Sequence, residues 1–371
     1  CYLRTGHGEF EQVEYYMSEV TRLGADLNDP DSVLFGMTHL SNTLVMLTRF
    51  DEALQEAEKT LAYAREHGNL HYQAEIQRWA IPICHLRNGD VAAATAALEE
   101  GMEIAVQIGD RASEAFCAYL QGRIAMDRGY LQDALSLSRR SQAAADATGF
   151  PASRALGACA VGTCYFTIGG TLTEAALQLH EEALQLVDMP SGSSLASPVW
   201  AEVGHCVLAS GKVDDAKHLF HRALTERTAL INLARPSALI GTIDVALLEH
   251  RQGDAAHTLT ELEEYVAERS MNDLRPAVLF TAAAVAAGAD DHTTALLRLA
   301  ECRDLALDAD MRIMLLDVHV AKTRSLRASG RLDEAATAEA EAREVAASVA
   351  ADISDAALRA TYLASVEARF A

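Results

Sequence analysis

The amino-acid sequence predicts an all-α protein, an α-solenoid in which about nine helical hairpins form one right-handed superhelix over residues 1–371. Three observations support this prediction. One short phrase recurs at regular intervals along the chain, glycine stands at a fixed offset within it, and apolar residues follow each copy with helical spacing. Repeats of this kind bury their apolar residues between neighbouring units, so length alone does not divide the chain into globular domains.

The composition agrees with a helical array. Half of the residues are hydrophobic, only 6% are aromatic and only seven are proline, which leaves long stretches free to form helix. Lys and Arg number 31 and Asp and Glu number 53, which gives a formal net charge of −22. Such an acidic surface repels phosphate backbones and anionic membranes. We therefore expect no nucleic-acid partner and no membrane partner for this segment.

Cysteine usage indicates a reducing compartment. None of the seven cysteines forms a CxxC pair, their number is odd, and most lie in apolar segments with helical spacing. Disulfides are rare in the cytosol, so this usage predicts a cytoplasmic protein. The longest apolar run, at 277–289, is too short to cross a bilayer. Because the chain starts at Cys1 inside a segment that reads as helix, we expect a fragment of a larger protein.

The recurring phrase runs from a glycine, through an apolar residue and one or two acidic residues, to a small residue that we call the anchor. The nine anchors are Val13, Ala53, Ala94, Ala134, Ala176, Ala216, Thr258, Ala295 and Ala335. All but one of the intervals between successive anchors lie between 40 and 42, and the exception, from Thr258 to Ala295, is 37. Six anchors have a glycine five positions upstream, namely Gly8, Gly89, Gly129, Gly211, Gly253 and Gly330.

Each part of the phrase has a physical role. Glycine tolerates positive φ and so ends one helix in a tight turn, and acidic residues in the first turn of the next helix face the positive end of its dipole. The small anchor lets the second helix cross the first closely, so we expect every anchor from Ala53 to Ala335 to be buried. Eight complete hairpins should follow an incomplete one, and each unit should contact mainly its neighbours.

Residues 200–223 bring the pattern close to a known family. The tetratricopeptide signature consists of a large residue, a Leu-Gly pair, a small residue, an aromatic residue and an alanine, in that order. This segment resembles the signature at Trp200, Val203, Gly204, Ala216, Phe220 and Ala223. Parts of it recur at Gly122 with Ala134, and at Ala176 with His180 and Ala183. The period here exceeds the family's usual length of about 34 residues, and the extra residues amount to about a turn and a half of helix.

Units of about 40 residues are similar to the sensor arms of MalT-type transcription activators. They are also similar to the arms of multidomain bacterial proteins that carry a nucleotide cyclase and an ATPase module. HEAT-type repeats share the period, but the glycine-to-anchor phrase argues against them. The resemblance implies a bacterial signalling protein that acts in transcription regulation.

Two segments depart from the repeat. Residues 188–199 are rich in Pro, Ser and Gly, which favours a longer loop between two units and leaves open a hinge that divides the solenoid. Residues 352–371 predict a last helix with Leu358, Tyr362 and Val366 on one face, which should cap the end of the stack.

We find no constellation of residues that predicts catalysis. The dipeptide Gly211-Lys212 lacks the upstream glycine of a P-loop and belongs to a repeat turn. His218 and His221 are spaced to hold a metal, but two polar residues on a solvated helix face explain them better. Adjacent pairs such as Cys84-His85 point in different directions on a helix and cannot form a catalytic dyad. We therefore expect no enzyme, no metal and no cofactor.

The resemblance also implies which side chains face a partner, because the inner wall of a tetratricopeptide array comes from the first helix of each hairpin. Transferring the inward-facing positions by register gives Asn42, Trp79, Arg87, Tyr119, Arg123, Tyr165 and His205. Aromatic residues and arginine carry much of the binding energy at interfaces. The alternative is that several of them belong to the core, since an error of register would place Trp79 between units.

The leading hypothesis is an interaction scaffold or sensor arm of a larger cytoplasmic signalling or regulatory protein. It would bind a protein or peptide segment, or another domain of its own chain, on the concave face; a homo-oligomer stays open. The alternative is a small-molecule effector-sensing domain of a transcriptional regulator. A deep aromatic pocket would favour the effector, and an open polar surface would favour the segment.

Overall fold

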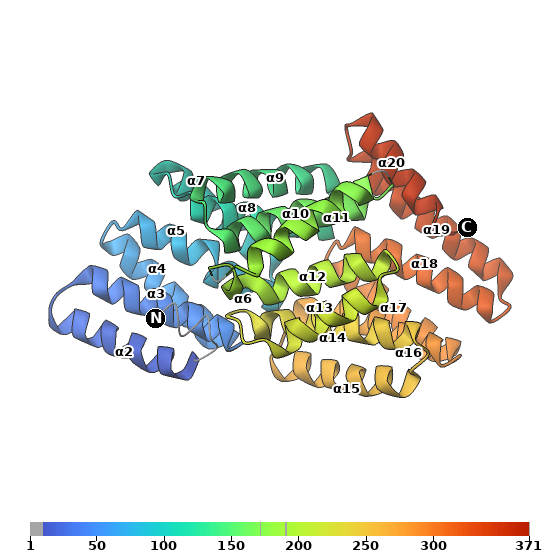
Figure 1. Ribbon diagram of the computed structural model, residues 1–371, viewed down its shortest axis with the longest axis horizontal. Helices are drawn as coiled ribbons and strands as arrows, with labels where there is room; N and C mark the ends of the chain where they lie inside the picture. The colour runs from blue at the N-terminus through green and yellow to red at the C-terminus, as the bar shows by residue number, and fades with distance from the viewer. Residues whose placement is uncertain (1–9, 171, 190, 371) are drawn as a thin grey trace.

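The computed structural model describes residues 10–170, 172–189 and 191–370, which form helices and loops without a β-strand. Helix α2 (Phe10–Asp26) belongs to the incomplete first unit, whose Gly8 lies outside the described residues. Eight hairpins follow in the described chain, as predicted (Figure 1). Hairpins 1 to 4 are α3 (Pro30–Met46) with α4 (Phe50–Glu66), α5 (Leu70–Arg78) and α6 (Ala80–Asn88) with α7 (Val91–Ile108), α8 (Arg111–Asp127) with α9 (Leu131–Thr148), and α10 (Pro151–Ile168) with α11 (Leu172–Val187).

The second half of the array repeats the arrangement. Hairpins 5 to 8 are α12 (Ala196–Ala209) with α13 (Val213–Thr225), α14 (Ile231–Leu248) with α15 (Gln252–Glu268), α16 (Arg275–Gly288) with α17 (His292–Asp308), and α18 (Arg312–Ala328) with α19 (Leu332–Ala351). Helix α20 (Ala356–Glu367) follows them. Two short 3₁₀ helices, η1 (Ser193–Leu195) and η2 (Asn272–Leu274), precede α12 and α16. The all-α solenoid predicted from the sequence is therefore confirmed.

The anchors lie buried in the second helices, with one exception. Six of them are fully buried, namely Ala53, Ala94, Ala134, Ala176, Ala216 and Ala295, and Val13 and Ala335 are nearly so. The prediction is wrong at Thr258, which is only partly buried, and the fully buried Ala255 takes its place. Here His250, with φ 57, makes the tight turn, and Gly253 lies inside α15. Counting five residues from Gly253 therefore placed the anchor three residues too late. With Ala255 as the anchor, the irregular interval after Thr258 disappears.

The residues of the tetratricopeptide signature pack as the resemblance implies. Trp200, Phe220 and Ala223 are buried, and Phe220 of α13 lies in a notch formed by Gly204 of α12 and Gly241 of α14. A Cβ atom on Gly204 would approach the Phe220 ring to 2.5 Å. The glycine therefore sets the distance at which these helices can pack.

A proline interrupts the first helix of hairpin 2. Helix α5 ends at Arg78, and Trp79 separates it from α6 with φ −133 and ψ −75. Pro82 has no N–H to donate, and in a continuous helix its ring would clash with the carbonyl group of Arg78. The break turns the backbone at Trp79, one of the predicted site residues.

First helices form the inner layer of the superhelix and second helices form the outer layer. Neighbouring first helices pack on one another, as α8 does on α10, α10 on α12 and α12 on α14. The second helices α7, α9, α11 and α13 pack instead against first helices on both sides. Helices that contact one another directly lie on the inside of the bend, so the stack curves around its first helices.

Hairpins five places apart meet along a line that we call the seam. Helix α3 contacts α14, α6 contacts η2, α8 contacts α18, and α10 contacts α20, so a superhelical turn takes five hairpins. The red helix α20 thus returns beside the green α10 in Figure 1. The expectation that each unit contacts mainly its neighbours is therefore incomplete, because the second turn packs on the first.

Polar groups bridge the seam at several of these crossings. Asn232 Nδ2 donates to the carbonyl oxygen of Met46 at 2.8 Å, and Arg87 forms an ion pair with Asp273 at 2.6 Å. Arg312 Nε donates to the carbonyl oxygen of Arg128 at 2.6 Å. Carbonyl groups at the ends of first helices, which have no partner within the helix, are thus satisfied by the next turn.

The two irregular segments take defined structure. Within 188–199 the described residues include η1, which makes a longer loop between α11 and α12; the hinge remains a prediction. Helix α20 buries Tyr362 and Val366, and Leu358 is partly buried. Ser365 Oγ donates to the carbonyl oxygen of Ile168 in α10 at 2.9 Å. The tail therefore packs on the middle of the array as well as on its end.

Candidate functional site

The inner wall is the surface of the first helices that faces the axis of the superhelix. Arg123 of α8 forms an ion pair with Glu202 of α12, and His205 Nε2 lies 3.0 Å from the carbonyl oxygen of Ser237 in α14. The negative charge of Glu202 raises the pKa of Arg123, whereas burial lowers the pKa of His205. The structure thus brings two predicted site residues, Arg123 and His205, to one part of the wall, and both already have protein partners.

Arg87, a third predicted residue, is also paired. Its guanidinium contacts Asp273 across the seam, and the exposed fractions of the two side chains are only 16% and 25%. An ion pair buried to this degree leaves little charge for an incoming anion. The structure thus pairs both Arg87 and Arg123 internally, with Asp273 and Glu202 respectively.

The predicted aromatic residues lie at the edge of the core. Trp79 packs edge to face on Phe116 with ring centroids 5.7 Å apart, and Tyr119 lies against two apolar clusters while remaining partly exposed. Burial raises the pKa of Tyr119. Trp79 Nε1 and Asn42 Oδ1 are buried and make no hydrogen bond among the described residues. Buried polar atoms usually have a partner, so these two atoms are candidates for contact with a ligand.

Tyr165 lies apart from the other predicted residues. Its hydroxyl accepts a hydrogen bond from Arg139 of α9 at 2.8 Å, so the side chain reaches toward the outer layer. The next residue, Phe166, lines the cavity described below. A shift of one residue rotates a side chain by about 100° around a helix. The register carried over from the family could not distinguish Tyr165 from Phe166.

Two carboxylates of the first helices were not predicted from the sequence. Asp127 and Asp244 form no ion pair among the described residues. Asp244 stands two helical turns after Ser237, the residue that contacts His205, and burial raises its pKa to about 6. The pKa of Asp127, an exposed residue at the end of α8, is also raised, mainly by desolvation among the surrounding helices. Carboxylates in such surroundings attract a cationic group.

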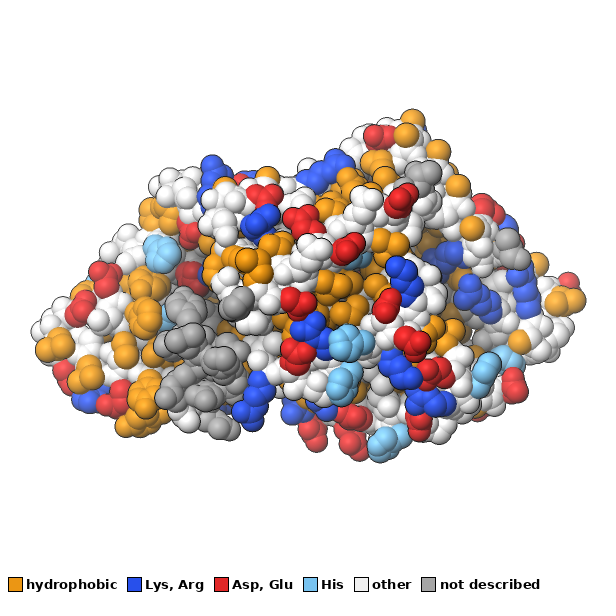
Figure 2. All heavy atoms as spheres, viewed as in Figure 1, with side chains coloured by type: hydrophobic (Ala, Val, Ile, Leu, Met, Phe, Trp, Pro, Cys, Tyr) orange, Lys and Arg blue, Asp and Glu red, His pale blue; other side chains and the backbone are white. Residues whose placement is uncertain are grey.

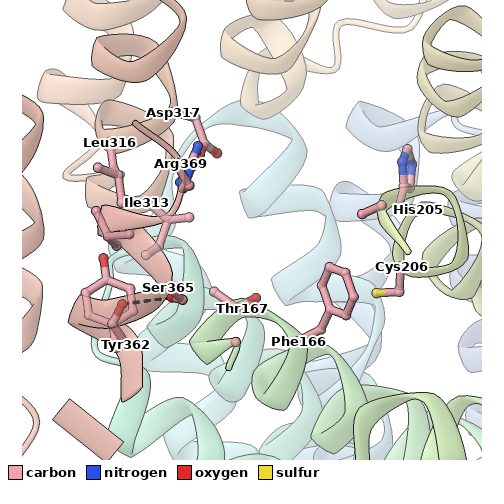
Figure 3. Close-up of a pocket in the computed structure, with 13 residues that line it drawn as sticks. Phe166, Thr167, His205, Cys206, Ile313, Leu316, Asp317, Tyr362, Ser365 and Arg369 are labelled. Atoms are coloured by element: carbon pink, nitrogen blue, oxygen red, sulfur yellow. Dashed lines mark hydrogen bonds and ion pairs between the residues drawn. The ribbon is translucent and has the colours of Figure 1, made fainter. Parts of the chain in front are cut away.

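A cavity of about 610 Å³ lies where the two turns of the superhelix meet. Its walls come from α10, α12, α18 and the C-terminal helix, and Figure 3 shows Phe166 and His205 facing Ile313, Asp317 and Arg369. Most of the lining is apolar, and the charged groups Asp317 and Arg369 form an ion pair at 2.5 Å. A mainly apolar pocket of this size with a few polar groups is typical of a small-ligand site.

The remaining titratable groups suggest no other site. Six cysteines in the described chain are buried free thiols, and burial raises the pKa of Cys84 to about 12. High thiol pKa values make these residues poor nucleophiles. His218 and His221 are exposed on α13, and the part of the chain that the structure describes holds no group of three His, Cys, Asp or Glu suited to a metal.

One helix of the described residues is long and apolar enough to cross a membrane, namely α14. In this structure it packs between α12, α13, α15 and α16. Pro236 cannot donate to the carbonyl group of Asn232, and the hydroxyl of Tyr265 donates to that oxygen instead at 2.9 Å. The packing and this compensation are those of a core helix in the array.

Comparison with known proteins bears on the fold. No protein-family model matches the chain, and no curated protein matches it in sequence. Among solved structures, a Rap protein complexed with Competence and Sporulation Factor is similar with a TM-score of 0.63 and 12% identity, covering 94% of this chain and 100% of that one. The TPR domain of P58(IPK) and a circular tandem repeat protein with a novel repeat topology also align, over 96% and 97% of this chain, with TM-scores of 0.24 and 0.23.

The Rap likeness, at this low identity, concerns architecture alone. It extends over nearly the whole array, and it agrees with the succession of helical hairpins described above. The chain is therefore a tetratricopeptide-like repeat domain of the all-α solenoid class.

Proposed function

We propose that this chain is the partner-binding arm of a larger cytoplasmic signalling or regulatory protein. It binds a protein segment, or another domain of the same protein, on its inner wall. The observation that carries the proposal is the meeting of polar and aromatic groups from successive first helices, with Tyr119, Arg123, Glu202 and His205 within one region. Solenoids use such concave surfaces for binding, and the described residues suggest no catalytic arrangement.

The charges favour a cationic segment. Arg87 and Arg123 are paired internally, whereas Asp127 and Asp244 form no ion pair among the described residues. The net charge of −22 would also steer a basic segment toward the protein. On the face seen in Figure 2, acidic and basic side chains are interspersed, so this face offers no continuous acidic surface. Asp127 and Asp244 on the inner wall would therefore determine where the basic segment binds.

A photo-cross-linker placed on the inner wall of the full-length protein tests this proposal. We expect one and the same cross-linked product from positions 127 and 244, and none from positions 58 and 217 on the exposed second helices α4 and α13. Products from the outer positions alone would overturn it. Once the partner segment is identified, Asp127→Asn with Asp244→Asn should weaken binding at least tenfold. Asp254→Asn, an exposed acid of α15, is the matched control.

The residues predicted from the sequence provide a second test. Tyr119→Ala with Arg123→Ala should abolish binding of the same segment, since truncating an aromatic hot spot commonly costs about 2 kcal/mol or more. The change also leaves Glu202 without its partner. Thermal unfolding must therefore be compared with Glu202→Gln, which removes the same ion pair and retains Tyr119. Unchanged binding by a folded double variant would place the segment elsewhere.

A second function, sensing of a small effector, is favoured by the cavity of about 610 Å³ between the two turns. A ligand there would contact α10 and α12 of the first turn and α18 and α20 of the second. Its binding would therefore favour a closed seam and could alter the curvature of the inner wall. Ala209→Phe, which places a ring in this cavity, tests this function by the loss of ligand binding.

A further inference from the structure

We infer that the cavity between the two turns binds an apolar carboxylate, that is, a compact hydrophobic group that bears one carboxylate. The inference rests on the effector-sensing function and names its ligand class. Two sources share this chemistry, a free small acid and the C-terminal residue of a partner segment. Three features of the cavity lead to it: its apolar floor, its paired arginine, and one buried hydroxyl.

The apolar part of the ligand would lie on the floor of the cavity. Phe166 projects from α10, and Ile313 and Leu316 project from α18 (Figure 3). Val366 of α20 also lines the cavity, so four apolar side chains from three helices surround the same space. The volume of about 610 Å³ exceeds that of any single amino-acid side chain. Burial of an apolar group here would favour binding, because it removes apolar surface from water.

The charge at the rim favours an anion. Arg369 uses its Nη2 to bond Asp317 at 2.5 Å, and Arg324 Nη2 donates to the carbonyl oxygen of Arg369 at 3.4 Å. Arg324 forms no ion pair with a carboxylate among the described residues, so these three groups sum to one positive charge beside the cavity. Figure 2 shows Lys and Arg side chains gathered beside a hollow near α18. A guanidinium has five donors, so Arg369 can bond a ligand carboxylate while it keeps Asp317.

A buried hydroxyl adds a second polar contact. Tyr362 is only 1% exposed, it lines the cavity, and its hydroxyl makes no hydrogen bond among the described residues. Burial raises its pKa, so the hydroxyl keeps its proton and can donate. Together Arg369 and Tyr362 would offer donors to the two oxygens of one carboxylate.

The test is calorimetric titration of the whole protein with matched probes. The small-acid pair is 4-phenylbutanoate and its primary amide, and the segment pair is a peptide that ends in leucine with a free or an amidated C-terminus. We expect the acid of at least one pair to bind at least tenfold more tightly than its amide. Tight binding of the free-ended peptide assigns the cavity to a segment terminus, whereas binding of phenylbutanoate alone assigns it to a free acid.

Variants separate the carboxylate from the apolar contribution. Arg369→Gln should remove the tenfold preference for acid over amide, and Asp317→Asn should strengthen acid binding several-fold, because it removes the carboxylate that competes for Arg369. Arg331→Gln, on the exposed start of α19, should change neither value. Equal binding of acid and amide to the unaltered protein, or weaker acid binding in Asp317→Asn when that variant is folded, would overturn the inference.

A cavity-filling variant distinguishes failure of this inference from failure of effector sensing. Ala209 lines the cavity at the end of α12 and is exposed, so Ala209→Phe should place a ring in the cavity and obstruct it without disturbing the core. We expect it to abolish binding of both acid and amide. If acid and amide bind equally and Ala209→Phe abolishes both, only the carboxylate preference fails. If no probe binds, the cavity is not a site for apolar effectors and both proposals fall.

Discussion

Glycines that end first helices stand in two different surroundings. Gly129 and Gly169 end first helices that meet the second turn: a Cβ on Gly129 would lie 2.9 Å from Val349, and one on Gly169 would lie 2.7 Å from Ser365. Gly211 and Gly330 end first helices that no later turn covers, and a Cβ on either would meet nothing within 4 Å. All four have positive φ. At the ends of these four first helices, glycine thus meets a backbone requirement in every case and a packing requirement only at the seam.

The largest difference should come from replacing these glycines by alanine. Gly169 has φ 82 and ψ −158, a conformation that costs other residues about 1–3 kcal/mol, and the contact with Ser365 adds a clash of similar size. Gly330→Ala meets only the strain of positive φ, about 1–2 kcal/mol. We expect a clearly lower unfolding midpoint in urea for Gly169→Ala. Equal midpoints for the two variants would mean that the seam does not hold the turns together.

Overpacking an anchor should show how far damage spreads. Ala134→Leu and Ala216→Leu each enlarge a side chain at a fully buried helix crossing, at a cost of roughly 1–3 kcal/mol. Ala134 belongs to hairpin 3, which contacts hairpin 8 across the seam, whereas Ala216 belongs to hairpin 5. Amide exchange should therefore accelerate in α18 for Ala134→Leu only. Faster amide exchange confined to the neighbouring hairpins in both variants would contradict this prediction.

Asp244 tests whether the closed superhelix isolates its inner wall from water. Burial raises the pKa of Asp244 to about 6, so this carboxylate binds a proton more tightly in the native protein than in the unfolded chain. The free energy of unfolding should therefore increase as the pH falls from 7 toward 5. Asp244→Asn should stabilise the protein at pH 7 by about 2 kcal/mol and flatten this pH dependence. Thermal unfolding midpoints of the parent and the variant at pH 5, 6 and 7 measure both effects. A variant less stable than the parent at pH 7 would show that the carboxylate has a favourable partner.

The smallest contrast concerns two arginines. Arg312 is 16% exposed and bonds both the carbonyl oxygen of Arg128 and Asp352, so Arg312→Gln should cost about 1–3 kcal/mol by leaving these groups without donors. Arg331 forms only an exposed pair with Glu334 within α19, and Arg331→Gln should leave the midpoint unchanged. Similar losses in both variants would indicate a general charge effect.

Local chemistry made most of the fold predictable. The glycine turns, the acidic first turns and the small anchors all act within a single repeat, so they are visible in one sequence. Thr258 was misplaced because His250 adopts positive φ in place of a glycine, which the phrase could not reveal. The seam was not predicted at all. Its contacts join residues far apart in the chain, such as Arg87 and Asp273, and no periodic pattern marks them.

The helices that form the candidate site could be predicted from the sequence, but the orientation and pairing of its side chains could not. The first helices do supply the inner wall, but whether Tyr165 or Phe166 faces inward depends on a rotation of one residue. The pairing of Arg123 with Glu202 depends on how tightly the superhelix closes. The cavity combines residues of α10 and α20, which become neighbours only because a turn takes five hairpins.

The seam also constrains how this protein could change by gene duplication. An open solenoid can gain or lose a single repeat internally, because each unit recognises only the units on either side. Here one added hairpin between α9 and α14 would place every later unit one position out of step with its counterpart in the first turn. Asn232, Asp273 and Arg312 would then all face the wrong partners together. The number of repeats is thus part of the tertiary structure, and related proteins that keep this seam should vary in loop length rather than in repeat number.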